Sequence, residues 1–264
     1  MLLVRVLGPF EVEGGDGPVT LAGASQRAVL ALLALRAGRP VGVPDLIDAL
    51  WPEDPPPSAR NSLQSHVARL RARLGVPGLI SLEPAGYRLN VPRSRVDALR
   101  FEDLVRDRTA PAEAVSLWRG PPLPEFPGEP FRSAAVRLVS LHRSVLLHLA
   151  GTLPTGSAAA ELHAAFDSDP CWEEGALALA EALSRAGSRG DAMEVLRRHA
   201  DAVVDHLGLD PSDQIRQAQL TLLRGAPSRP RPAADPPPAT AGPALPPSVA
   251  AGSALPPSAT AGSV

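Results

Sequence analysis

The sequence predicts a mainly α-helical protein, in which a small α+β domain is followed by an all-α domain and a disordered tail. Three observations lead to this fold class. Short extended segments and three helical patterns share the first 97 residues, helical patterns fill the middle of the chain, and the end is rich in Pro, Ala, Gly and Ser. We therefore divide the 264 residues into a first domain at 1–97, a second domain at 98–225 and a tail at 226–264.

The first domain is predicted to contain strands, three helices and a hairpin, in that order. Gly8-Pro9 interrupts the extended segment, and a Gly-rich turn at 14–18 follows it. Ser25 is expected to cap the first helix and Ser58 the third. The predicted elements are extended segments at 2–12 and 19–21, helices at 26–37, 44–51 and 58–74, and a hairpin made of 79–82 and 87–91.

The third predicted helix, at 58–74, carries the functional signal. Its apolar stripe consists of Leu63, Val67, Leu70 and Leu74, which must face the core. The opposite side holds Asn61, Ser65, Ala68, Arg69 and Ala72. The helix has four arginines and no acidic residue, whereas solvated structural helices usually mix Glu with Arg. Small residues permit close approach to a surface, and Arg and Asn pair with base edges. These features indicate a DNA-reading helix; the alternative is an amphipathic surface helix that happens to lack acids.

Composition excludes several classes of protein. All 26 basic residues are Arg, so the chain can form neither a Walker A phosphate loop nor a Schiff base. One cysteine, Cys171, excludes an internal disulfide and a cysteine-based zinc cluster. No uncharged apolar run reaches 18 residues and no secretory signal is evident. We expect a cytoplasmic protein with no membrane partner, no cofactor, no metal site and no enzymatic activity.

Charge is distributed unevenly along the chain. Residues 1–100 carry 12 Arg against 9 acids, whereas residues 101–225 carry 12 Arg against 18 acids. The overall net charge of −2 therefore hides a basic first domain and an acidic second domain. Because local charge decides nucleic-acid binding, this distribution favours the first domain as the DNA-binding part.

The second domain is predicted to be helical throughout. A long helix is expected at 129–151, and helices at 175–187 and 189–208 should form a hairpin joined at Gly187, which resembles one tetratricopeptide-like unit. The tail after residue 225 holds eleven of the 31 prolines and no aromatic residue. Such a composition buries too little apolar surface to offset chain entropy, so we expect the tail to be disordered.

Two helices followed by a basic third helix and a hairpin are typical of a winged helix-turn-helix, with the third helix in the major groove and the hairpin as the wing. The chain resembles the Streptomyces antibiotic regulatory protein family, in which an OmpR/PhoB-type winged helix precedes a bacterial transcriptional activator domain. The matching stretches in the first domain are VRVLGPFEV, QRAVLALLALRAGRPV, LIDALWPEDPPPSARNSLQSHVARLRARLG and AGYRL. Those in the second are VDALRFEDLV, AVSLWRGPPL, AGSRGDAMEVLRRHADAV and HLGLDPSDQI.

The resemblance implies roles for residues of the third helix. Its base-reading positions match Asn61, Ser65 and Arg69, the same side that the helical wheel places opposite the core. The residues expected at phosphates or the groove edge are Arg60, Ser62, Gln64, Arg71, Arg73 and, in the wing, Arg88. The resemblance also implies binding to direct repeats in promoters as a homodimer on double-stranded DNA, and activation by recruiting RNA polymerase holoenzyme.

Two functions from different classes follow. The first is a sequence-specific transcriptional activator of a biosynthetic gene cluster for secondary metabolites. The second is a helical scaffold that binds other proteins, with a winged helix that does not bind DNA. The acid-free third helix with small residues on its outer face favours the first function.

Overall fold

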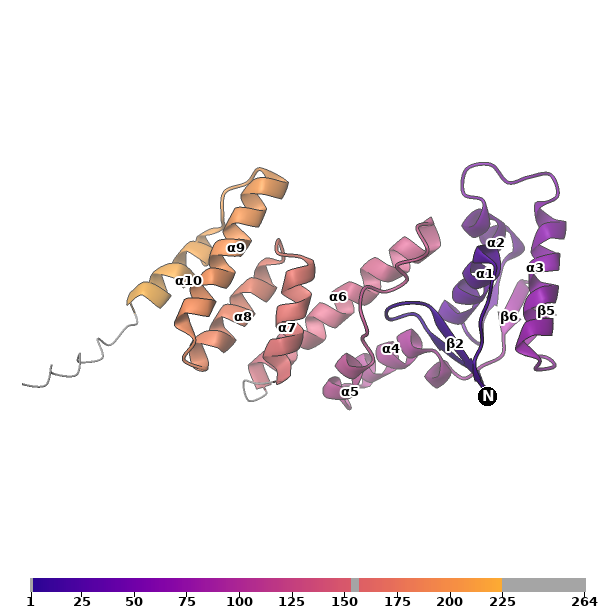
Figure 1. Ribbon diagram of the computed structural model, residues 1–264, viewed down its shortest axis with the longest axis horizontal. Coiled ribbons are helices and arrows are strands. Elements are labelled where there is room, and N and C mark those ends of the chain that lie inside the picture. Colours follow the sequence, from indigo (N-terminus) through magenta and orange to yellow (C-terminus); the bar gives the residue numbers. More distant parts are fainter. Residues whose placement is uncertain (1, 153–156, 225–264) are drawn as a thin grey trace, which may run out of the picture. The chain divides into compact units, whose positions relative to one another are not determined.

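The computed structural model describes residues 2–152 and 157–224, and within these ranges the protein is mainly α-helical with two small sheets near the N-terminus (Figure 1). The predicted fold class is thereby confirmed for the described residues. The tail at 226–264, which we expect to be disordered, lies outside them.

A three-stranded antiparallel sheet opens the chain. It contains β1 (Leu3–Arg5), β2 (Glu11–Gly14) and β3 (Gly17–Pro18), with Val4 opposite Val12. The third strand begins two residues before the predicted segment at 19–21, because Gly17, at φ +112°, allows a tighter turn than we assumed. Val19 continues the pairing with one hydrogen bond from its N–H to the carbonyl of Val12.

Three helices follow, namely α1 (Ala24–Leu35), α2 (Val43–Leu50) and α3 (Ala59–Leu74). The prediction that Ser25 caps the first helix is wrong: Gly23 occupies the N-cap and Ser25 lies inside α1. Ser58 does occupy the N-cap of α3, but its side chain makes no capping hydrogen bond. Gly75 ends α3 in the left-handed conformation, as expected for a helix C-terminus.

The predicted hairpin forms with small shifts at its ends. Strands β5 (Ile80–Glu83) and β6 (Gly86–Leu89) pair antiparallel, and β4 (Pro40–Val41) adds to the other edge of β6. This sheet constitutes the wing. Gly86 is required where β6 begins, because its φ is +135° and an added Cβ would lie only 1.9 Å from the carbonyl oxygen of Val41.

The remaining described chain is helical. After a short 3-10 turn at Arg93–Arg95, the helices are α4 (Asp97–Asp107), α5 (Pro111–Ser116), α6 (Glu129–Thr152), α7 (Ser157–Ser168), α8 (Glu173–Arg185), α9 (Arg189–Leu207) and α10 (Asp213–Arg224). Helices α8 and α9 form the predicted hairpin, and Gly187 turns between them at φ +85°.

One continuous apolar core extends through the described residues of the first 225. It includes Leu30 and Leu70 of the three-helix part as well as Phe101, Phe131 and Phe166 of the later helices. The core does not divide at residue 97, so the boundary between the first and second domains stays a prediction from the sequence. None of the helices in 2–152 and 157–224 combines the length and apolarity needed to cross a membrane.

Candidate nucleic-acid interface

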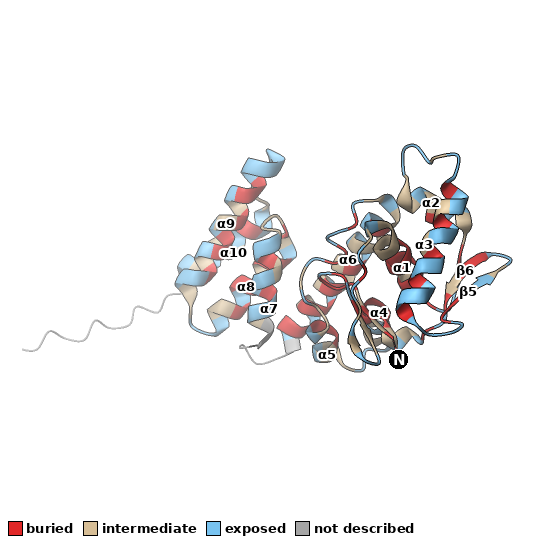
Figure 2. Ribbon diagram, turned by 45° about the vertical axis from the view of Figure 1, so that its right-hand side comes forward, coloured by how far each residue is buried: buried red, intermediate tan, exposed pale blue. Residues whose placement is uncertain are grey.

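Helix α3 buries the face that the sequence predicts. Leu63 and Leu70 are fully buried, and Val67 and Leu74 are nearly so. Figure 2 shows this division, with buried residues on the inner side of the helix and exposed ones on the outer side. The stripe packs against α1 and α2, so the packing fixes which side chains of α3 face solvent.

The outer face of α3 presents the three predicted base-reading residues. Asn61, Ser65 and Arg69 are all exposed, and they follow one another at intervals of four residues along one side of the helix. Ser65 donates its hydroxyl hydrogen to the carbonyl of Asn61 at 3.0 Å. The Arg69 guanidinium makes neither a hydrogen bond nor an ion pair with any described residue. The structure thus brings the three residues together on a solvent-facing surface.

Arg60 and Gln64, predicted at the groove edge, are also exposed, whereas Ser62 is half-buried. Within 2–152 and 157–224, Arg60 has no carboxylate partner. No ion pair joins Arg60, Arg69, Arg71 or Arg73 to a described carboxylate, so the positive charges of this acid-free helix are not compensated within the described residues. Such a surface attracts an anionic polymer, because neutralising its phosphates releases bound counterions.

The other three predicted phosphate contacts already have protein partners. Arg71 donates from Nε to the carbonyl of Ile80 at 3.0 Å, and its guanidinium lies 6.0 Å from the centroid of the Tyr87 ring. Arg73 donates from Nε to the carbonyl of Thr20 at 3.0 Å. These two arginines fasten α3 to the wing and to the chain before α1, a role that the sequence did not suggest.

In the wing, Arg88 forms an ion pair with Glu83 at 2.9 Å and donates from Nε to the side chain of Asn90 at 2.7 Å. Its charge is therefore partly compensated by a neighbouring strand. Tyr87, beside it, is buried in the hairpin and does not reach the surface.

His66 is a residue of this surface that sequence reasoning did not select. It is half-buried on α3, and its ring centroid lies 6.4 Å from that of Trp51. Burial, reinforced by the nearby Arg69 guanidinium, lowers the pKa of His66. Its Nδ1 is buried and has no hydrogen-bond partner among the described residues. The available sequence signal is its position next to Val67 of the buried stripe and Ser65 of the outer face.

A metal-binding cluster does not emerge in the described part of the chain. Its residues contain no group of three or more His, Cys, Asp or Glu side chains placed to hold a metal ion. The single cysteine, Cys171, is half-buried, and its Sγ lies 3.6 Å from the carbonyl oxygen of Ala202.

Three packed helices, of which the third has an exposed outer face, and the β4-β6-β5 wing define a winged helix-turn-helix transcription regulator. Family comparisons agree. Residues 17–89 match the family described as "Transcriptional regulatory protein, C terminal", and residues 92–223 match the bacterial transcriptional activator domain. The chain belongs to the Streptomyces antibiotic regulatory protein family of transcriptional activators. Its relatives are transcriptional regulators, which confirms the expectation that it is not an enzyme.

Similar proteins are found in Streptomyces and in Mycobacterium. Regulatory protein DnrI of Streptomyces peucetius is 29% identical over 272 residues, covering 90% of this chain and 98% of DnrI. Transcriptional regulatory protein EmbR of Mycobacterium tuberculosis is 34% identical over 253 residues, covering 84% of this chain. The chain spans 63% of the length of EmbR.

A solved structure has the same architecture. Mycobacterium tuberculosis EmbR in complex with a low-affinity phosphopeptide matches with a TM-score of 0.68 and 31% sequence identity. The match covers 86% of this chain and 66% of that chain. The arrangement of winged helix and helical domain is therefore shared with a known regulator.

Proposed function

We propose that the protein is a sequence-specific transcriptional activator that binds direct repeats of double-stranded DNA in promoters. Two copies bind as a homodimer on the DNA and recruit RNA polymerase holoenzyme. The regulated genes form a biosynthetic cluster for a secondary metabolite, and the protein acts in the cytoplasm. Membership of the activator family supports the regulatory role.

The outer face of α3 is the observation that carries the DNA-binding part of this proposal. Asn61, Ser65 and Arg69 are exposed on a helix that contains no acid. Arg pairs with guanine through two hydrogen bonds, and Asn pairs with adenine in the same way. Arg69 has no competing carboxylate among the described residues, so base pairing does not require an internal ion pair to break.

The test is to select bound sequences from a random DNA pool with the full chain, and then to measure affinity by fluorescence anisotropy. Arg69→Ala should weaken binding to the selected sequence by about 1–3 kcal/mol and relax the preference at one base position. Arg197→Ala is the matched control, because Arg197 lies on α9 and pairs with Glu194 and Asp201. If the selection enriches no sequence, or if Arg69→Ala and Arg197→Ala change the DNA affinity equally, α3 does not read a specific sequence.

A second candidate function, a protein-binding helical scaffold, is favoured by one observation. Several large apolar side chains are exposed near the end of the described helices, namely Val204, Leu207, Leu209, Leu220 and Leu223. Exposed large apolar side chains can mark a surface that contacts other proteins. If the selection recovers no DNA and the purified chain still forms a stable complex with RNA polymerase, the scaffold function replaces the DNA-binding one.

A further inference from the structure

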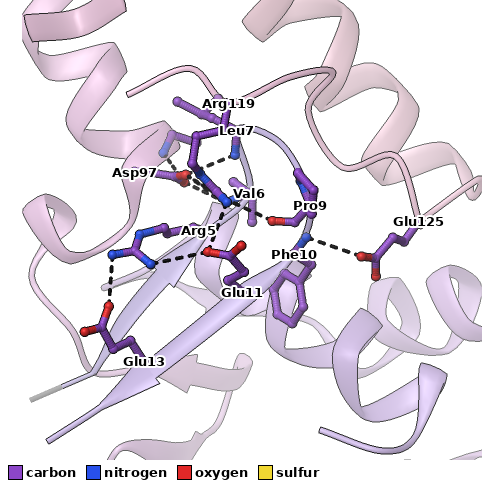
Figure 3. Close-up of polar contacts among 11 residues, drawn as sticks. Arg5, Val6, Leu7, Pro9, Phe10, Glu11, Glu13, Asp97, Arg119 and Glu125 are labelled. Atoms are coloured by element: carbon purple, nitrogen blue, oxygen red, sulfur yellow. Dashed lines mark hydrogen bonds and ion pairs between the residues drawn. The ribbon is translucent and has the colours of Figure 1, made fainter. Parts of the chain in front are cut away.

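We propose that Asp97 and Arg119 are positioning residues that hold the helical domain in one fixed orientation relative to the winged helix. This inference rests on the proposed function in one respect: the fixed orientation makes two copies bind adjacent repeats cooperatively. We call the contact the interdomain clamp. It comprises residues 6–11, which connect β1 to the first residue of β2, Asp97 at the start of α4, and the segment 119–126 between α5 and α6 (Figure 3).

Asp97 provides the first half of the clamp. Its carboxylate accepts hydrogen bonds from the backbone N–H of Val6 at 2.8 Å and of Leu7 at 3.0 Å. It also accepts one from Ala98, in the first turn of its own helix, at 2.7 Å. The residue is 5% exposed. A carboxylate is costly to bury unless its lone pairs are used, and here backbone donors from two parts of the chain use them.

Segment 119–126 provides the second half. The N–H of Arg119 donates to the carbonyl of Leu7 at 2.9 Å, and the N–H of Leu123 donates to the carbonyl of Val6 at 3.0 Å. All four backbone polar groups of Val6 and Leu7 are therefore bonded to residues from 97 onward. The backbone of Val6 and Leu7, which directly follow β1, is thus hydrogen-bonded only to the second domain and to the Asp97 that precedes it.

The side chain of Arg119 crosses the same contact. It donates to the carbonyl of Pro9 at 3.1 Å, pairs with Glu11 at 3.0 Å and approaches Asp97 at 3.8 Å. Figure 3 shows the guanidinium lying between these three residues. One arginine thus connects the first sheet with the carboxylate that anchors α4.

The close approach at Gly8 shows how tightly the two parts fit. Gly8 has φ +132°, and an added Cβ would lie 2.9 Å from Cβ of Arg119 and 3.2 Å from its backbone carbon. A methyl group at this position would force the first sheet and segment 119–126 apart. It would do so without removing a single hydrogen-bonding group.

The clamp also reaches the DNA-binding helices. Glu125 accepts a hydrogen bond from the N–H of Phe10 at 3.4 Å and forms an ion pair with Arg27 of α1. The rings of Phe10 and Phe126 meet edge to face with their centroids 5.4 Å apart. Because α1 packs directly on α3, the helical domain is connected to the recognition helix through one packed layer.

A rigid contact between the two domains affects how cooperatively two copies bind DNA. Two domains on a flexible linker must lose orientational freedom before neighbouring copies can touch, and this loss weakens cooperative binding. A clamped helical domain is already oriented when α3 enters the groove. Loss of the clamp should therefore spare binding to one repeat and weaken cooperative binding to two.

The first arm of the test measures orientation without DNA. Nitroxide labels are attached to Glu53→Cys and Asp205→Cys, which are exposed positions in the two parts, after Cys171→Ser removes the native thiol. Double electron–electron resonance should give a narrow distance distribution for this labelled chain. Gly8→Ala and Arg119→Ala, and above all the two combined, should broaden it, whereas Arg197→Ala should not. The clamp is overturned if the distance distribution of the labelled parent is already broad. It is also overturned if the distribution stays narrow in the combined Gly8→Ala and Arg119→Ala variant.

The second arm measures DNA binding by full-length variants whose circular dichroism shows that they are folded. Affinity for one repeat should stay within about twofold of the parent, whereas the cooperativity between two repeats, typically 5–150-fold for coupled sites, should fall towards one. A merely structural defect would lower both. Equal cooperativity in the parent and in the combined Gly8→Ala and Arg119→Ala variant overturns the role of the interdomain clamp. Absence of DNA binding by the parent refutes the proposed function, and the label distances then still decide whether the clamp exists.

Discussion

At the scale of single residues, the arginines of α3 divide into two kinds. Arg71 and Arg73 donate to backbone carbonyls, whereas Arg60 and Arg69 face solvent without a partner among the described residues. Residue type alone does not separate them, because all four lie on the polar side of one helix. What separates them is the position of Ile80 and Thr20, which is set by chain segments outside the helix.

This division predicts different effects of two alanine substitutions. Arg71→Ala should lower the free energy of unfolding by about 1–2 kcal/mol, because it removes a charged donor and leaves the Ile80 carbonyl without it. Arg60→Ala should leave stability within about 0.5 kcal/mol and reduce the dependence of log affinity on log salt by about one. Urea unfolding and salt titrations measure the two effects, and the reverse pattern would contradict the assignment.

His142 gives a second prediction at this scale. Its ring stacks on Trp118 with centroids 4.0 Å apart and planes at 2°, and burial lowers its pKa to about 4. The unfolded chain takes up a proton near pH 6.5, which the folded chain resists until about pH 4. Stability from this group is therefore present above pH 6.5 and declines as the pH falls towards 4.

The expected loss between pH 7 and pH 5 is about 2 kcal/mol. His142→Phe keeps a ring against Trp118 but cannot bind a proton. Urea unfolding at the two pH values should therefore show a loss about 2 kcal/mol smaller in the variant than in the parent. Equal losses would mean that His142 is protonated with an ordinary pKa in the folded state.

At the scale of elements, the wing depends on one glycine. Gly86→Ala would bring a methyl carbon into the carbonyl oxygen of Val41, so β4 and β6 could not stay paired. We expect a loss of at least about 3 kcal/mol, the range of severe packing defects. Gly75→Ala is the control: it also has positive φ, at +65°, but nothing lies within 4 Å of the added carbon, so it should cost only about 1–2 kcal/mol. Similar losses of unfolding free energy in the two variants would show that both arise from backbone strain at positive φ and not from the contact with Val41.

The elements that could be predicted from the sequence are those with a strong local signal. Helix α3 begins and ends within one residue of its prediction, because its apolar stripe and Gly75 define it. N-caps are harder to predict: Gly23, not Ser25, occupies the N-cap of α1, and neither Gly23 nor Ser58 of α3 makes a side-chain capping hydrogen bond. The exposed position of Asn61, Ser65 and Arg69 followed from the wheel, since the buried stripe leaves only one side to solvent.

The interdomain clamp could not be predicted. The bonds from Val6 and Leu7 to Asp97 connect residues separated by 91 and 90 positions, and no periodicity or spacing records such a pairing. In the sequence, Gly8-Pro9 indicates only a break in an extended segment. Its close approach to Arg119 depends on the folded path of a segment that is more than a hundred residues away.

At the scale of the whole molecule, cooperative binding should depend on the spacing between repeats. Two clamped copies on a direct repeat must lie on one side of the duplex, about one helical turn or a multiple apart. Inserting half a turn, about five base pairs, should abolish cooperative binding and activation, and a full-turn insertion should restore part of both. Gel-shift and reporter assays measure the two quantities; indifference to spacing would mean that the copies bind independently.

The bonding of Val6 and Leu7 also bears on how such regulators can be recombined. A chimaera that joins a relative's winged helix to this chain's helical domain at residue 97 would pair a foreign β1–β2 loop with Arg119 and Leu123. The residue that replaces Gly8 in the foreign loop would have to fit against Arg119, where an added Cβ would come within 2.9 Å of the Arg119 Cβ. Chimaeras in which residues 6–11 come from the same protein as the helical domain should be more stable, because they keep this contact intact. The unit that can be moved intact is therefore larger than the boundary near residue 97 suggests.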